Sequence, residues 1–350
     1  MGTLRIPFEV AEVCLKNVLT AHGCPEDKAA KTAHEMARNS LEGVYTHGIN
    51  RFARLVRNME EGIVKPEENP VVISRNGAIE RVDGKMGLGI INAWFCMEEA
   101  IHLAEVHGIG LVALKDTNHW MRAATYGYQA CDAGMAGICF TNTMPNMPTW
   151  GAVDSRIGNN PLVMAFPRKG GHLITDMAMS QFSYGALELA RLQGREMEID
   201  AGFDVDGNLT KVPERVIQSQ RILPTGYWKG AALSFMLDIF SGALSAGNTV
   251  SEVGKLPGDE HGVSQVFIAI DYKKIVPEET AAAIVEGAVE DLLASKKAEG
   301  TERIIYTGQK TEECRRENLE KGIPVDERVW KEIEALRPDW KGWSDTWRFE

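Results

Sequence analysis

The sequence predicts an α/β fold with a peripheral helical domain, in which the C-terminal helices pack back on the N-terminal ones. Apolar residues recur at three- and four-residue spacing over residues 8–64, as expected for amphipathic helices. Short apolar runs then alternate with helical segments, and helical spacing returns near the C-terminus. We therefore expect a helical domain from residues 1–64 and 311–340, an α/β region from 65–310, and a C-terminal tail at 341–350.

Composition and charge narrow the class of protein. The 350 residues carry a net charge of −11 and no run of lysine or arginine, which disfavours nucleic acid and anionic membranes as partners. No stretch approaches the roughly 18 consecutive apolar residues of a membrane span, and the N-terminus does not match a secretory signal. Six scattered cysteines without a Cys-x-x-Cys pair indicate buried thiols. These features predict a soluble cytoplasmic protein.

The N-terminal helices are expected at 8–23, from Pro25 to Ser40, and at 49–61. The stretch "GVYTHGINRF" (43–52) interrupts the last two, with two glycines around a short polar segment. A break of this kind within a helical region indicates a loop with a functional role.

The central region begins with "VVISRNGAIERV" (71–82), in which Asn-Gly separates two apolar runs and predicts a hairpin. Further strands are expected in "GIGLVALKDTN" (108–118), "GICFTNT" (137–143), "PLVMAFP" (161–167), "LITDMA" (173–178) and "QVFIAIDY" (265–272). Helices are expected at 90–107, 123–133, 184–194, 229–246, 277–297, 311–321 and 326–336.

Two of the eight histidines lie where a catalytic group would be useful. His47 occupies the glycine-bounded break, and His119 follows a predicted strand in "TNHWMR". Catalytic side chains favour such loops, and imidazole exchanges its proton near neutral pH. Arg51 could hold a carboxylate while a histidine offers a proton to the adjacent carbonyl, which suits a 2-oxo acid. We expect His47, Arg51 and His119 to face one cavity, with Trp120 beside them; a purely structural, helix-capping histidine is the alternative.

Other chemistries lack their motifs. No Gly-x-Gly-x-x-Gly links a strand to a helix, since "GKMGLG" (84–89) has the wrong order. No Walker sequence, His-Glu-x-x-His or Gly-x-Ser-x-Gly is present. A dinucleotide would therefore bind without the usual glycine loop, and no metal site is expected.

Two residues suit a dinucleotide nonetheless. Asp176 ends a predicted strand, where it could accept hydrogen bonds from ribose hydroxyls or cap the next turn. Lys229 stands at a glycine-rich helix start, where a cation beside free N–H groups suits a pyrophosphate, or is simply a solvated lysine.

Longer motifs resemble those of the malate/L-lactate dehydrogenase type-2 oxidoreductases. They are "SLEGVYTHGINRF", "HGIGLVALKDTNHWMRAATYG", "TNTMPNMPTWGA", "RIGNNPLVMAFP", "MAMSQFSYG" and "PTGYWKGAALSFMLDI", in the same order over about residues 6–336. The resemblance implies a non-Rossmann NAD(P)-binding fold of the sulfolactate dehydrogenase type, with a large mixed sheet and a helical domain. It also implies homodimers or larger assemblies with active sites near the subunit interface.

The resemblance further implies NADH, with NADPH possible, and reduction of a 2-oxo sugar acid such as 2,3-diketo-L-gulonate. Malate, lactate, ureidoglycolate and cyclic imino acids remain open as substrates, as does a ligand-binding homologue without catalysis. In one branch of the family the proton donor matches His47, and in another the acid/base histidine matches His119. The residues expected to bind the substrate are Arg51, Thr46, Tyr45 and Asn118. Those expected to bind the cofactor are Thr143, His172, Leu173, Ile174, Thr175, Asp176, Met177, Ala178, Trp228, Lys229, Gly308, Gln309 and Lys310. Gln309 and Lys310 depart from the family's usual residues there.

Overall fold

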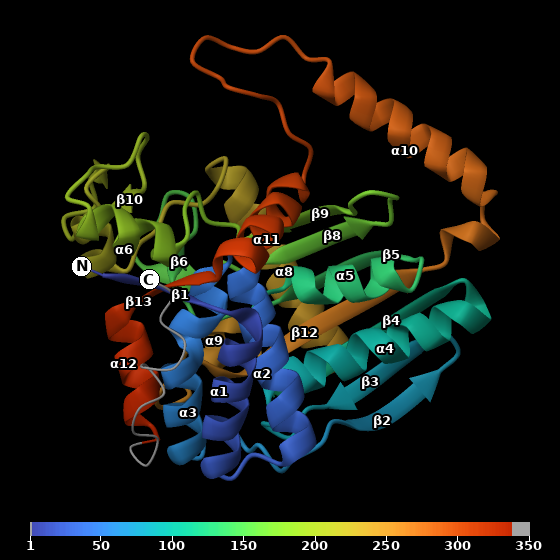
Figure 1. Ribbon diagram of the computed structural model, residues 1–350, viewed down its shortest axis with the longest axis horizontal. Coiled ribbons are helices and arrows are strands. Elements are labelled where there is room, and N and C mark those ends of the chain that lie inside the picture. The colour runs from blue at the N-terminus through green and yellow to red at the C-terminus, as the bar shows by residue number, and fades with distance from the viewer. Residues whose placement is uncertain (1, 338–350) are drawn as a thin grey trace.

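A seven-stranded mixed sheet forms the centre of the molecule in the computed structural model, which describes residues 2–337 (Figure 1). The strand order is β2-β3-β4-β12-β5-β8-β9. Only β3 and β4 pair in parallel; the other neighbours in this sheet are antiparallel. The strands are β2 (Val71–Asn76), β3 (Ile79–Asp83), β4 (Ile109–Asn118), β12 (His261–Ile270), β5 (Ala136–Thr141), β8 (Leu162–Phe166) and β9 (Leu173–Met177). The predicted α/β class, the mixed sheet and the Asn76-Gly77 hairpin are confirmed.

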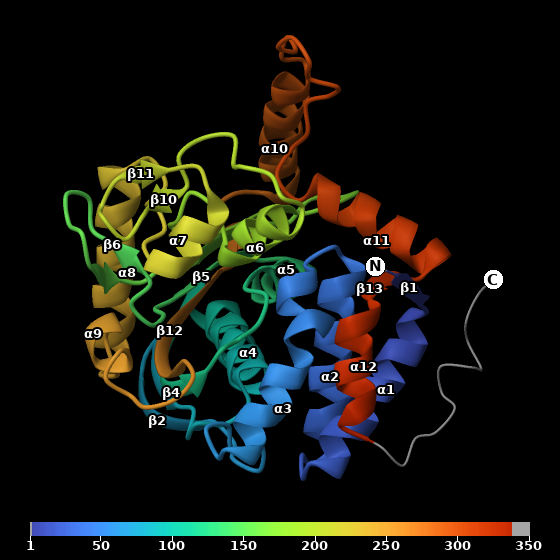
Figure 2. The ribbon, with the colours of Figure 1, turned by 90° about the vertical axis from the view of Figure 1, so that its left-hand side faces the viewer.

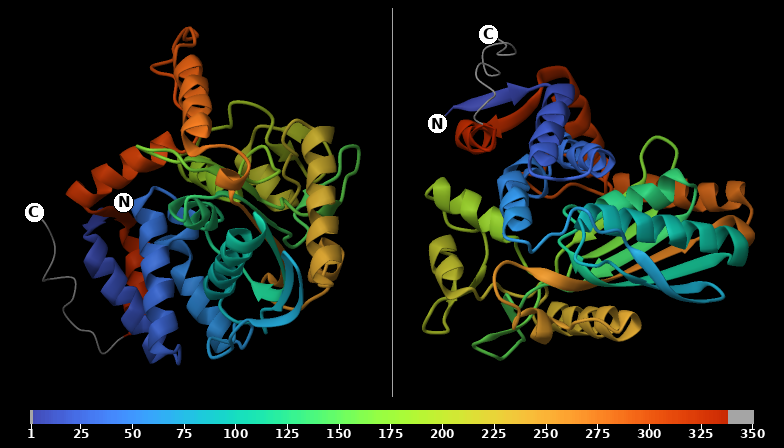
Figure 3. Two further views of the ribbon diagram at one scale, coloured as in Figure 1. Left: turned by 90° about the vertical axis from the view of Figure 1, so that its right-hand side faces the viewer. Right: turned by 90° about the horizontal axis from the view of Figure 1, so that it is seen from below.

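Helices cover both faces of this sheet (Figure 3). On one face lie α4 (Gly89–His107) and α5 (Ala124–Asp132), and on the other lies α8 (Trp228–Ser245). Because side chains alternate along a strand, Val112 packs with the α4 and α5 side chains, whereas Ala113 packs with those of the α8 face. The central strands β4 and β12 are therefore apolar on both sides.

The N-terminal helices α1 (Phe8–Ala21), α2 (Glu26–Leu41) and α3 (Phe52–Glu60) pack beside the sheet together with α12 (Glu327–Ala335) from the other end of the chain (Figure 2). One apolar core joins them, and it includes Leu15, Met36, Phe52 and Trp330. As expected, the C-terminal helices pack back on the N-terminal ones. The exact domain boundaries stay a prediction, and the tail at 341–350 lies outside the described residues.

Two short strands missing from the sequence-based prediction tie the chain ends together. β1 (Thr3–Ile6) pairs in antiparallel orientation with β13 (Ile323–Asp326), which separates α11 (Gln309–Lys321) from α12. Four residues give too little periodicity to identify a strand from sequence.

The remaining elements lie around the sheet. They are α6 (Tyr184–Leu192), α7 (Pro213–Ser219), α9 (Val250–Val253), the pair β6 (Met147–Pro148) and β7 (Ser155–Ile157), and the pair β10 (Gly202–Phe203) and β11 (Leu209–Thr210). Helix α10 (Glu278–Leu293) projects away from the body of the molecule (Figures 1 and 2). Among residues 2–337, no helix combines the length and the apolar character needed to cross a bilayer.

Candidate active site

The predicted break in the N-terminal helices is confirmed as two 3₁₀ turns, Tyr45–His47 and Ile49–Arg51, between α2 and α3. Helix α3 therefore begins at Phe52 rather than at residue 49. Gly48 lies so close to α2 that an added Cβ would stand 2.2 Å from Ser40 Oγ. Ser40 Oγ accepts a hydrogen bond from the Ile49 N–H (2.8 Å). Contact with α2 thus shapes the loop that carries His47.

A second loop, after β4, carries His119. Met121 adopts a positive φ of 64°, which is uncommon outside glycine. The Met121 N–H donates a hydrogen bond to His119 Nδ1 (2.9 Å). Trp120 turns the other way: it is buried and stacks on Tyr126, whose hydroxyl donates to the Trp120 carbonyl (2.6 Å). The expectation that Trp120 faces the cavity is therefore wrong, because the indole packs into the core against Tyr126 and Phe267.

The two predicted catalytic histidines meet. The rings of His47 and His119 stack with centroids 5.5 Å apart and an interplanar angle of 18°. Burial is the largest cause that lowers the pKa of His47 from 6.5 to about 4, and the charges of Arg51 and Arg122 add to it. Burial, followed by Arg51, His47 and Arg54, holds the pKa of His119 well below 6.5. Both imidazoles are thus neutral at pH 7 in the free protein.

Arg51 and His119 line one small cavity of about 10 Å³, but His47, which was expected to face the same cavity, is not among its lining residues. The other lining residues are Arg54, Leu55, Asn58, Val64, Asn118, Met121 and Glu260. The Arg54 guanidinium is ion-paired with Asp259, whereas that of Arg51 has no hydrogen-bond or ion-pair partner among residues 2–337. An unpaired, half-buried guanidinium is suited to receive an anion.

The other predicted substrate residues differ in their surroundings. Asn118 donates its amide hydrogens to the carbonyls of Met86 (2.8 Å) and Gly87 (2.9 Å), and its buried Oδ1 lacks a partner. Thr46 Oγ1 lies 3.2 Å from His47 Nδ1. The Tyr45 hydroxyl instead contacts Cys314 Sγ on α11 (3.9 Å), so the fold engages Tyr45 in packing between helices.

The predicted cofactor segments lie along β9. Leu173, Ile174, Thr175, Asp176 and Met177 form this strand, His172 precedes it and Ala178 follows it. On one side the Ile174 N–H donates to the Thr307 carbonyl (3.3 Å), next to Gly308, Gln309 and Lys310 at the start of α11. Past the end of the strand, the Thr225 N–H donates to the Met179 carbonyl (2.8 Å), shortly before Trp228 and Lys229 begin α8. The fold therefore connects segments that are far apart in sequence.

The strand β9 also contacts the segment that follows the His119 loop. Asp176 Oδ2 accepts a hydrogen bond from the Ala124 N–H (2.8 Å) at the start of α5, just after the His119 loop. Thr143 lies beyond β5, where its Oγ1 contacts Asn159 and Asn160 (3.2 Å each). Trp228 and Lys229 are exposed.

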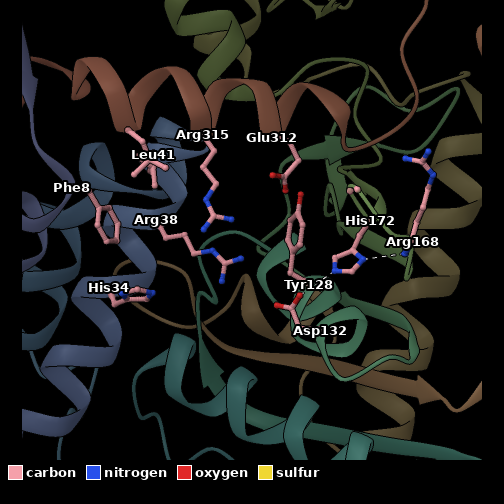
Figure 4. A pocket seen from close by; sticks show the side chains of 13 residues that line it. Phe8, His34, Arg38, Leu41, Tyr128, Asp132, Arg168, His172, Glu312 and Arg315 are labelled. Atoms are coloured by element: carbon pink, nitrogen blue, oxygen red, sulfur yellow. Dashed lines mark hydrogen bonds and ion pairs between the residues drawn. The ribbon is translucent and has the colours of Figure 1, made fainter.

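A larger cavity of about 540 Å³ lies between α1, α2, α5 and α11 (Figure 4). It includes His172, but neither His47 nor His119 lines it. Arg38 and Arg315 point into it beside Asp132 and Glu312, whereas Arg168 lies at its edge and pairs with Glu286 (2.8 Å). Sequence reasoning missed these arginines, because on predicted helices and turns they resemble ordinary surface residues.

These residues fit a dinucleotide. Gly308 has a φ of 96°, and an added Cβ would stand 2.8 Å from the His172 carbonyl oxygen, so only glycine allows this close backbone approach. The N-terminus of the 13-residue helix α11 lies beside it, and the positive end of the helix dipole there favours a phosphate. Among residues 2–337, no cluster of three or more histidine, cysteine or acidic side chains could hold a metal ion.

The family model of malate/L-lactate dehydrogenase matches residues 6–334. The chain therefore belongs to the malate/L-lactate dehydrogenase family and is a pyridine-nucleotide-dependent oxidoreductase with this family's non-Rossmann fold.

Its similarity to individual relatives spans nearly the whole chain. It is 43% identical to 2,3-diketo-L-gulonate reductase of Citrobacter koseri and 42% identical to that of Escherichia coli O1:K1, over 95% of this chain and 100% of each relative. Malate dehydrogenase from Pyrococcus horikoshii OT3 superposes with a TM-score of 0.88 at 30% identity, covering 96% of this chain and 95% of that one. For sulfolactate dehydrogenase from Methanocaldococcus jannaschii the TM-score is 0.89 at 26% identity, covering 97% of each chain.

Proposed function

We propose that this protein reduces a 2-oxo sugar acid with NADH, and that the substrate is 2,3-diketo-L-gulonate, reduced at C2 to 3-dehydro-L-gulonate. The observation that carries this proposal is the 42–43% identity to 2,3-diketo-L-gulonate reductases along 95% of the chain. The stacked histidines beside an unpaired arginine supply the chemistry that such a reduction needs.

The reduced nicotinamide supplies the hydride that adds to the C2 carbonyl carbon. Arg51 holds the substrate carboxylate with two parallel N–H donors, which places the adjacent carbonyl at the histidines. His47 gives a proton to the carbonyl oxygen as negative charge develops there. Burial is the main cause of the low pKa of His47 in the free protein, and the carboxylate counters the further lowering by Arg51 and Arg122.

Polar groups near the histidines support a hydroxylated substrate. Asn118 Oδ1 is buried without a partner and would accept a hydrogen bond from a sugar hydroxyl. Thr46 adds an exposed hydroxyl close to His47. A site with such groups discriminates against a substrate that ends in a bare methyl, because the buried acceptor stays unpaired.

For the cofactor, we propose that residues 172–178, 228–229 and 308–310, together with Thr143, hold NADH.

We also propose a homodimer, located in the cytoplasm. Helix α8 packs on the sheet through a face that includes Gly230, Ala231, Ser234 and Ser241, while six large apolar side chains point outward. These are Leu233, Phe235, Met236, Ile239, Phe240 and Leu244, all between 39% and 52% exposed. A continuous apolar face of this kind is typical of a surface that a partner covers. A second copy of the chain is the proposed partner.

Oxidation of NADH and NADPH against a panel of 2-oxo acids tests the proposal. We expect kcat/KM for 2,3-diketo-L-gulonate with NADH to exceed the values for pyruvate and oxaloacetate. A higher value for oxaloacetate or pyruvate would assign the protein to malate or lactate chemistry instead, and a cyclic imino acid in the panel tests that branch. Binding of NADH without turnover of any compound would indicate a non-catalytic homologue.

A further inference from the structure

The two stacked histidines differ in what their Nδ1 atoms contact. His119 Nδ1 receives the main-chain N–H of Met121 (2.9 Å), a group that can only donate. This nitrogen must therefore act as the acceptor, and the proton of the neutral ring lies on Nε2. Protonating Nδ1 would place two N–H groups against each other and remove the hydrogen bond.

The Met121 N–H is fixed in this position. Met121 keeps its left-handed backbone, and the preceding carbonyl, that of Trp120, is held by the Tyr126 hydroxyl. Tyr126 is fully buried in the core beneath the sheet. Rotation of this peptide to relieve a protonated His119 would break a buried hydrogen bond, which is costly.

His47 is under no such constraint. Its Nδ1 lies 3.2 Å from Thr46 Oγ1, and a hydroxyl either donates or accepts by rotating its hydrogen. His47 can therefore gain or lose a proton while the contact to Thr46 persists.

The charges around His119 also disfavour a second proton on its ring. Arg51 and Arg54 line the cavity with it, Glu260 lies there as the acidic group, and His47 stacks on its ring. Of the two arginines, Arg54 is neutralised by Asp259, whereas Arg51 is not. Two cationic rings at 5.5 Å beside a free guanidinium would repel each other, so one imidazolium at most is accommodated.

We propose that His119 acts as a neutral hydrogen-bond donor through Nε2 to the oxygen of the reacting carbonyl, while His47 alone gives up the proton. This division of roles rests on the proposed function. It makes His119 a catalytic residue that stabilises developing charge, and Met121 the residue whose main chain positions it.

The C2 carbon gains a hydride, and the carbonyl π electrons move to the oxygen. The Nε2–H of His119 stabilises that oxygen by a hydrogen bond and stays on the ring. The imidazolium of His47 gives its Nε2 proton to the oxygen and becomes neutral, with its Nδ1–H donated to Thr46 Oγ1. Solvent then returns one proton to His47.

The first test needs no turnover. Two-bond ¹H–¹⁵N spectra of protein labelled at histidine, with His47→Gln and His119→Gln to assign the signals, report which ring nitrogen is protonated. We expect His119 to remain the neutral Nε2–H form as the pH is lowered from 8 to 5. A neutral Nδ1–H form, or a change to the imidazolium in this range, would overturn the proposal.

The second test compares substitutions at both positions. A glutamine side chain places an amide N–H near the position of Nε2 but cannot release a proton. We expect His119→Gln to be roughly tenfold or more faster than His119→Ala, the scale of one hydrogen bond, whereas His47→Gln and His47→Ala should be equally slow. Equal rates for His119→Gln and His119→Ala in folded protein, verified by circular dichroism, would contradict the donor role. A wild-type protein without activity on 2-oxo acids would refute the proposed function, and the spectra would still decide the protonation of His119.

Discussion

Glu42 and Arg122 form an ion pair that is almost completely buried, with side chains 1% and 4% exposed. Arg38 Nε donates to the same carboxylate (3.0 Å). Burial alone would raise the pKa of Glu42, but Arg122 and Arg38 outweigh it and hold the pKa below its usual value. Because Glu42 directly follows α2 and Arg122 follows the His119 loop, the pair joins the segments that carry the two histidines.

Glu42→Gln should destabilise the protein, because it leaves the buried Arg122 and the partly buried Arg38 without a full counter-charge. We expect a loss of about 3–5 kcal/mol in the free energy of unfolding, measured by urea denaturation. Glu317→Gln is the matched control, since Glu317 and Lys321 form an exposed pair (55% and 57%) worth no more than about 0.5 kcal/mol. Similar losses in both variants would show that burial of the Glu42 pair contributes little.

His47→Ala and His47→Gln should each lower turnover by roughly 100-fold or more, the usual effect of losing a general acid. Affinity for NADH, measured by its fluorescence, should stay close to that of the wild type. His102→Ala, at an exposed histidine on α4, serves as the control and should be fully active. Near-normal turnover after His47 replacement would assign the proton transfer to another group.

Arg51→Lys should raise KM for the 2-oxo acid more than it lowers kcat. Lysine keeps the charge but loses the two parallel donors that hold a carboxylate. Steady-state kinetics measure both constants, and Arg57→Lys on the exposed side of α3 is the control. An unchanged KM for every active substrate would remove Arg51 from the binding site.

The stability of the free protein should fall as the pH decreases from 6.5 to about 4. The unfolded chain takes up the His47 proton near pH 6.5, whereas the folded protein takes it up only near pH 4. The unfolded state therefore binds more protons in this window, and acid favours unfolding. His47→Gln should lose stability less steeply than the wild type in urea titrations at pH 4.5, 5.5 and 6.5. Equal slopes for both proteins would contradict the low pKa.

Phe240→Glu should weaken subunit association, because it places a charge in the middle of the exposed apolar face of α8. Sedimentation velocity should show a shift towards monomer, and activity per chain should fall at concentrations where the monomer dominates. Val106→Glu, at a residue of α4 that is 73% exposed, should leave the assembly intact. A wild-type protein that sediments as a fully active monomer would refute the proposed homodimer.

Local patterns predicted most helices and strands, but they could not predict how distant strands pair. The Asn76-Gly77 hairpin was identifiable because both strands and their turn lie within one short stretch. The pairing of β4 with β12 joins residues such as Ile109 and Ile270, and no local signal specifies it. The strands β1 and β13 are short and depend on each other, so neither is recognisable alone.

In the candidate site, too, local features could be predicted from the sequence, whereas contacts between distant segments could not. The break around His47 could be identified from its glycines, and the loop after β4 from its polar residues. The stacking of His47 on His119 could not be predicted, because it depends on the packing of α2 against the His119 loop. The contacts are the Glu42–Arg122 ion pair and the Asn39 amide, which donates to the His47 carbonyl (3.0 Å). The burial of Trp120 depends on its packing against Tyr126 and against Phe267 on the distant strand β12, and no local sequence signal predicts that contact.

The pairing of β1 with β13 has a consequence for synthesis of the chain on the ribosome. Ile323, Val325, Trp330 and Ile333 complete the apolar core around α1 and α2, and they emerge only after the sheet and both histidine loops have been made. The helices that support His47 must therefore wait, partly uncovered, for the last segment to dock. Contacts between such distant segments slow folding and leave apolar surface open to aggregation until they form. Nascent chains arrested before residue 323 should consequently bind chaperones and lack activity, even though both proposed catalytic residues are already present.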